Sequence, residues 1–298
     1  MTSGERYFNG HVMRFLHTGV QGRYNTYRAT VRPWLWFLTR TADCRIFQNM
    51  KAPEIVQKVF DDHSIADVKS ELMGDYRKRE YCVQYRESDF NFVSRLLEEE
   101  GIYYYLRHAL GRHTLVLTDS HSTHRPIESG AELPFVPQER VRPEQQAVTE
   151  WSAGAEVRSG AYVMDDYNFK EPRVARLANR RAPKGHSLGD YEIYDYPGEY
   201  LVLGEGESYA RRRLEEEHAQ FEIFTGTTTS RALATGSTFK LKGHPRSDQA
   251  REYLVVSATH QLEFTDYESM EGRGSSYACT FTAIRSVEPF RPRRSTPN

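Results

Sequence analysis

The chain has 298 residues, and its 40 Lys and Arg balance 41 Asp and Glu to a formal net charge of −1. This balance gives no global attraction to nucleic acid or to an anionic membrane surface. Hydrophobic residues make up 38% and charged residues 27%, which is typical of a globular protein with room for one large or two ordinary domains. The longest strongly apolar run, residues 34–38, is far below the roughly 20 residues that a membrane-spanning helix needs.

The N-terminal residues lack the basic-then-apolar order of a secretory signal peptide, so we expect no such signal. Cys44, Cys82 and Cys279 are few and far apart. They fit a reduced cytoplasmic protein and indicate neither a zinc site nor a disulfide framework.

The first third of the chain predicts extended segments around one helix. Strand patterns cover residues 7–16, 27–39 and 65–72, with a turn at the glycines of residues 19–22 between the first two. Pro53 suits the first turn of a helix, which we expect to end by about His63.

Residues 81–106 predict a strand, a helix and a second strand, and each boundary has a physical cause. Tyr81 and Tyr85 alternate with polar residues at the strand period of two. Ser88 can cap a helix, and Gly101 can end it in the left-handed conformation. Apolar residues recur between them at helical spacing, namely Phe90, Val93, Leu96 and Leu97. The strand that contains Tyr103, residues 102–106, is expected to pair with residues 113–118 around a turn at Gly111.

The second half of the chain predicts mainly strands. Four prolines within residues 120–143 indicate an extended connection that crosses the surface. Strand patterns then cover residues 147–151, 160–169, 221–229, 237–242, 253–262 and 276–284. A polar loop is expected over residues 173–189 and a helix from about Gly206 to His218. We therefore predict a mainly β (α+β) fold with barrel-like sheets and a few short helices.

Candidate chemistry is weak throughout the chain. His108, His113, His121 and His124 cluster in sequence, but they lack the converging geometry of a metal site, and we interpret them as surface histidines. Ser237 and Lys240 match S-x-x-K within a predicted strand, without the accompanying motifs. Glu98, Glu99 and Glu100 are interpreted as a solvated helix face. We assign no catalytic residue, no cofactor and no metal ligand.

The stretch YCVQYRESDFNFVSRLLEEEGIYYY, residues 81–105, with HTLVLTDS at residues 113–120, closely resembles the VgrG family. These are spike or tip proteins of the bacterial type VI secretion system, with a region similar to the baseplate hub of contractile phage tails. The resemblance implies two barrel-like hub regions, over residues 1–125 and 126–289, and residues 290–298 are expected to be a disordered tail. It also implies a homotrimer that caps the hexameric Hcp tube and helps to deliver effectors.

The resemblance further implies assembly in the cytoplasm and export by the type VI apparatus, with effector or adaptor proteins as partners and without nucleic acid binding or stable membrane insertion. The chain begins close to a strand that, in the family, follows several dozen earlier residues. It ends before the family's OB-fold and β-helical needle. We therefore expect an incomplete first barrel and weak, concentration-dependent self-association. Two alternatives to the structural hub remain open, an effector- or adaptor-binding module and a hydrolase or metal-dependent enzyme.

Overall fold

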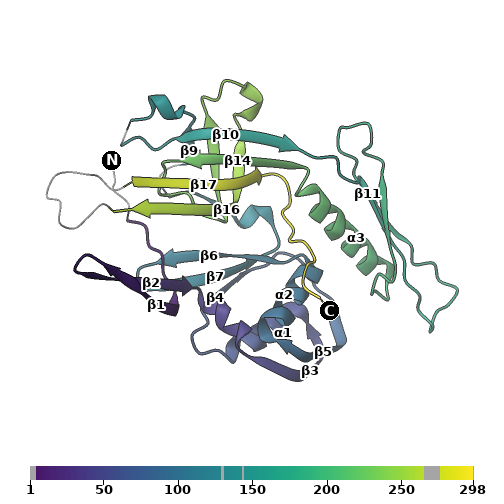
Figure 1. Ribbon diagram of the computed structural model, residues 1–298. Coiled ribbons are helices and arrows are strands. Elements are labelled where there is room, and N and C mark those ends of the chain that lie inside the picture. Colours follow the sequence, from purple (N-terminus) through teal and green to yellow (C-terminus); the bar gives the residue numbers. More distant parts are fainter. Residues whose placement is uncertain (1–4, 129–130, 143, 265–275, 298) are drawn as a thin grey trace. The chain divides into compact units, whose positions relative to one another are not determined.

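The computed structural model describes residues 5–128, 131–142, 144–264 and 276–297 (Figure 1). These residues form two compact units. The N-terminal unit contains residues 5–119 and 292–297, and the C-terminal unit contains residues 120–291.

The N-terminal unit begins with a two-stranded antiparallel ribbon of β1 (His11–Gln21) and β2 (Tyr24–Arg32). Gly22 makes the turn at a φ of 60°, where the sequence predicts one. The predicted strand over residues 27–39 is too long, because residues Trp34–Thr39 form a 3₁₀ helix. Pro33 lacks an N–H for a continued ladder, and the helical spacing buries Leu35 and Leu38 together.

The rest of this unit packs two helices against short sheets. Helices α1 (Ala52–Asp61) and α2 (Asp89–Glu100) match the predicted ones. Strand β3 (Ala42–Lys51), which the sequence analysis missed, pairs antiparallel with β5 (Lys78–Ser88). A second sheet has the order β4 (Val68–Glu71), β7 (Arg112–Thr118) and β6 (Tyr103–Ala109). Strands β6 and β7 are joined at Gly111, with a φ of 76°, as predicted.

A seven-stranded, half-barrel sheet dominates the C-terminal unit (Figure 1). Its order is β10 (Val148–Ala155), β14 (Glu222–Thr228), β17 (Ser276–Arg285), β16 (Glu252–Glu263), β15 (Ser237–Lys242) and β8 (Arg125–Pro126), and β9 (Glu132–Pro134) also pairs with β15. The proline-bearing segment therefore adds β8 and β9 to this sheet, parallel to β15, and does more than cross the surface.

A smaller three-stranded sheet completes the unit. Strand β11 (Ala161–Met164) lies between the antiparallel β12 (Ala178–Arg181) and the parallel β13 (Glu192–Asp195). Helix α3 (Leu203–His218) packs on β11 and β12. Strand β12 falls where the sequence predicted only a loop. Single 3₁₀ turns occupy His121–Thr123, Gln138–Arg140 and Ser247–Gln249.

The predicted mainly β fold class is confirmed. Each unit has its own apolar core: Trp34, Phe60 and Phe92 are among the largest side chains of one, and Phe239 and Tyr253 of the other. Among the described residues, no helix combines the length and apolar character required to cross a membrane.

Candidate functional site

The helix at the centre of the sequence motif is bounded as its capping residues predict. The Asn91 N–H donates to the Ser88 hydroxyl over 3.2 Å at the first turn of α2. Gly101 ends the helix at a φ of 67°, and its N–H reaches the Glu98 carbonyl. The Ile102 N–H then donates to the Leu97 carbonyl, which completes the glycine-terminated cap and directs the chain into β6.

The predicted motif residues divide between core and surface. Val93, Leu96 and Leu97 are buried in one cluster, and Tyr103 is also buried. Phe90 is only half-buried, whereas Phe92, which the sequence analysis passed over, is fully buried and stacks on Phe47 with 5.5 Å between ring centroids. The buried stripe of α2 therefore runs through residues 92, 93, 96, 97 and 100, a regular helical spacing.

Strand β5 buries the face that its aromatic residues do not occupy. The side chains of Tyr81 and Tyr85 are 57% and 64% exposed, whereas Cys82 and Gln84 between them are buried. Gln84 is accommodated because its amide Nε2 donates to Asp89 Oδ1 over 2.7 Å. The two tyrosines are therefore surface residues of the N-terminal unit.

Glu99 and Glu100 are not the solvated face that the sequence suggested. Glu100 is buried, and its Oε1 lies 2.6 Å from Nη2 of Arg79. Glu99 accepts from Nη1 of the same guanidinium over 2.9 Å. Burial lowers the pKa of Arg79, but the charges and hydrogen bonds of the two carboxylates outweigh it and raise this pKa. The pair fixes the end of α2 on β5.

Asp89 anchors the other end of the helix. Its carboxylate, which is buried, accepts from the Thr41 hydroxyl over 2.6 Å and from Arg45 Nη2 over 2.7 Å. Burial alone would raise the pKa of Asp89. Hydrogen bonds from Gln84 and Thr41 and the charge of Arg45 outweigh burial, so the pKa of this carboxyl is lowered. Both ends of α2 are thus held by buried ion pairs, which is a structural arrangement.

His113 is a core residue and not the surface histidine that the sequence suggested. It is 4% exposed, and its Nε2 accepts from the Trp34 N–H over 2.8 Å. Nδ1 must therefore carry the proton that it shares with Asn9 Oδ1 at 2.6 Å. His121 is exposed, and Nδ1 of His124 lies 2.8 Å from the Gly236 carbonyl oxygen. In the described part of the chain, no three His, Cys, Asp or Glu side chains are grouped to hold a metal ion.

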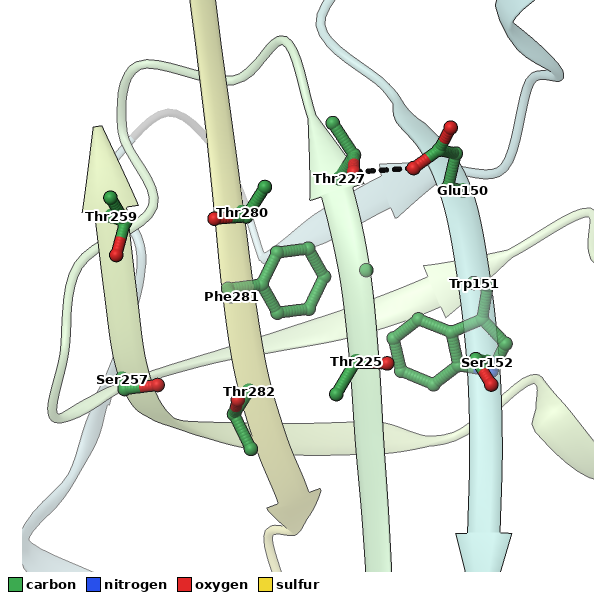
Figure 2. Close-up of a pocket in the computed structure, with 11 residues that line it drawn as sticks. Glu150, Trp151, Ser152, Thr225, Thr227, Ser257, Thr259, Thr280, Phe281 and Thr282 are labelled. Atoms are coloured by element: carbon green, nitrogen blue, oxygen red, sulfur yellow. Dashed lines mark hydrogen bonds between the residues drawn. The ribbon is translucent and has the colours of Figure 1, made fainter. Parts of the chain in front are cut away.

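A surface hollow of about 450 Å³ lies on the open face of the seven-stranded sheet (Figure 2). Hydroxyl side chains from four adjacent strands line it: Ser152, Thr225, Thr227, Ser257, Thr259, Thr280 and Thr282. The Glu150 carboxylate at its rim accepts from the Thr227 hydroxyl over 2.7 Å. Trp151 and Phe281 form its floor.

This hydroxyl groove can form hydrogen bonds, but its lining residues include no pair of titratable side chains. Glu150 is the one titratable side chain among its lining residues. An activated serine or threonine needs a general base that a third group orients, and no second titratable side chain lines the groove to orient Glu150 beside Thr227. Ser237 of the S-x-x-K match is committed elsewhere, because its hydroxyl donates to the Ala234 carbonyl. The groove is not predictable from the sequence, because its residues come together only through the pairing of distant strands.

Known proteins resemble this chain along nearly its whole length. The spike protein VgrG1b of the Pseudomonas aeruginosa type VI secretion system is 41% identical over 98% of this chain, which spans 40% of that relative's length. Escherichia coli c3393, described as a type VI secretion component with structural similarity to the T4 tail proteins gp27 and gp5, superposes with a TM-score of 0.68. That match is 24% identical and covers 100% of this chain and 66% of c3393.

A third likeness is to a Francisella PdpA–VgrG complex, with a TM-score of 0.55, 9% identity, and 92% of this chain and 44% of the other covered. The family model of the phage tail baseplate hub (GPD) matches residues 1–265. The recognition of the VgrG motif from sequence is thereby confirmed. This chain belongs to the phage tail baseplate hub (GPD) family.

Proposed function

We propose that this chain forms the structural hub of a type VI secretion spike. In this role three copies assemble into a ring that caps the Hcp tube, and the ring helps to deliver effectors. The observation that carries the proposal is the 41% identity to a VgrG1 spike protein across 98% of this chain. The two hub regions are proposed to cover residues 1–125 and 126–289, and the spike is proposed to leave the cell through the apparatus.

The side-chain chemistry supports a role in assembly and not in catalysis. The buried charges described above tie strands to a helix, and Glu150 is the one titratable side chain that lines the hydroxyl groove. A ring of rigid sheets can transmit a compressive push, and repeated weak contacts with a hexameric tube add avidity. No cofactor, nucleic acid or inserted membrane segment enters this proposal.

A second candidate is an effector- or adaptor-binding module. It is favoured by the solved Francisella complex, in which a VgrG is bound to PdpA. The two roles are compatible, because a hub can present one surface to its tube and another to its cargo. We favour the hub role and keep the binding module as the second candidate.

Sedimentation of the purified chain, alone and with Hcp hexamers, tests the proposal. The expected species has three times the 34.6 kDa chain mass and co-sediments with Hcp at one trimer per hexamer face. A chain that stays monomeric at every concentration contradicts the trimeric hub. A trimer that never co-sediments with Hcp contradicts the tube-capping role alone.

A further inference from the structure

Asn9, which lies just before strand β1, is held by two histidines of the β6–β7 hairpin. His108 and His113 are directly opposite each other in the register of these strands, with 6.0 Å between their ring centroids. The Asn9 N–H donates to Nδ1 of His108 over 3.1 Å, and Nδ1 of His113 lies 2.6 Å from Asn9 Oδ1. These three residues, here called the Asn9 clasp, fasten residues 6–10 to a hairpin that is distant in sequence.

The Asn9 clasp requires both imidazoles to be neutral, and each in a different tautomer. Nδ1 of His108 accepts a hydrogen bond, so the proton of this ring is on Nε2. In His113 the arrangement is reversed, because Nε2 accepts from the Trp34 N–H over 2.8 Å and Nδ1 donates to Asn9. A second proton on either ring would point at an N–H group and break the bond that the ring now accepts.

The charges around the clasp also oppose protonation of the two rings. Partial burial and the positive charge of Arg6 lower the pKa of His108. Burial and the neighbouring His108 and His11 lower the pKa of His113, and the ring centroid of His11 lies 5.7 Å away. Among the described groups that act on either ring, one is acidic, Asp67, and it already accepts a hydrogen bond from strand β7. Protonated rings would therefore repel one another with little compensation.

We propose that the Asn9 clasp is an acid-sensitive switch that releases residues 6–10 from the β6–β7 hairpin as the pH falls below about 6.5. His108 is exposed, so a proton reaches it without opening the core, and its bond to the Asn9 N–H is then lost. The hairpin itself should persist, because its strands pair along their length and bury Leu115 and Val116. Release removes an anchor of the segment that leads into β1.

The direction of this switch follows from which state binds protons more readily. Both histidines have lowered pKa values while the segment is docked. On release the rings lose Arg6 and His11 as neighbours, so their pKa values move back towards the usual 6.5. The docked state is therefore fully favoured above pH 6.5, and protons shift the equilibrium towards release below it. Each histidine can raise the release constant by at most about tenfold per pH unit.

Residue-resolved hydrogen exchange of the full chain, corrected for the intrinsic exchange rate, tests the switch. Protection of the Asn9 amide should fall about tenfold between pH 7.5 and 5.5, while the paired amides of the β6–β7 hairpin keep theirs. His108→Gln retains an acceptor for the Asn9 N–H but cannot titrate, so most of this fall should disappear. Asn9→Ala removes the bond to His113 and should lower the protection already at pH 7.5.

His17→Gln is the matched control, because it removes an exposed histidine of the same unit that lies outside the clasp. Its Asn9 amide should respond to pH as in the natural chain. The switch is overturned if the Asn9 amide is equally protected at both pH values, or if His108→Gln keeps the whole fall. It is also overturned if the hairpin amides lose protection in parallel, since the whole unit then opens. The clasp lies within one chain, so none of these results bears on the proposed hub role.

Discussion

Nη2 of Arg79 in β5 lies 2.6 Å from Oε1 of the buried Glu100 in the last turn of α2. The helix dipole places negative charge at this end, so a carboxylate there is unfavourable unless a cation compensates it. Arg79 supplies that cation and also holds Glu99. The contact therefore converts an unfavourable helix terminus into a fixed junction between helix and strand.

Glu100→Gln should destabilise the N-terminal unit by about 3 kcal/mol, because it leaves a largely buried guanidinium with one carboxylate instead of two. Glu80→Gln provides the matched control, since Glu80 is an exposed carboxylate next to Arg79 in β5. Urea unfolding at neutral pH gives the two free energies. Equal effects of the two substitutions would show that the buried pair contributes nothing beyond an ordinary surface charge.

Sequence predicted the boundaries of α2 because its ends depend on local chemistry. Ser88 caps and Gly101 terminates without help from distant residues. The burial of Glu100 could not be predicted, since it depends on a contact between helix α2 and Arg79 in strand β5. The same limit explains the missed β3 and the hydroxyl groove, which exist only through pairing with distant strands. The sequence predicts a strand where a 3₁₀ helix follows Pro33, because this aromatic run also fits strand propensity.

Phe92→Ala should cost about 3–5 kcal/mol of folding free energy, because the ring is fully buried and stacked on Phe47. Phe90→Ala, in the same helix, removes the same atoms from a half-buried position and should cost clearly less. Thermal melting or urea titration ranks the pair. If Phe90→Ala proved the more damaging change, the buried stripe assigned to α2 would be wrong.

Stability should fall as the pH drops through the range of histidine titration, and His113 should account for part of that loss. Burial lowers the pKa of His113 below its usual 6.5, and the nearby His108 and His11 lower it further. A second ring proton would also oppose the Trp34 N–H at Nε2. The unfolded chain therefore binds this proton more readily than the folded one, so the stabilisation is complete above pH 6.5 and shrinks below it.

His113→Gln tests this linkage. The substitution should destabilise the protein at pH 7.5, and the difference from the natural chain should narrow near pH 5, measured by urea unfolding at both values. Exposed His121→Gln serves as the matched control and should show no such narrowing. A His113→Gln penalty that stayed constant with pH would mean that this imidazole does not titrate differently on folding.

Gly226 leaves the space into which the Phe281 ring fits beneath the hydroxyl groove. A Cβ at Gly226 would lie 2.8 Å from the Phe281 ring and 2.7 Å from the Glu150 carbonyl oxygen. Gly226→Ala should therefore force β10, β14 and β17 apart and cost about 1–3 kcal/mol. Gly154→Ala in the neighbouring β10 is the matched control, because its nearest atom, the Ile223 oxygen, would lie at an ordinary 3.7 Å. Thermal melting should place Gly226→Ala well below the control, and equal melting temperatures would show that the sheet absorbs the added methyl without strain.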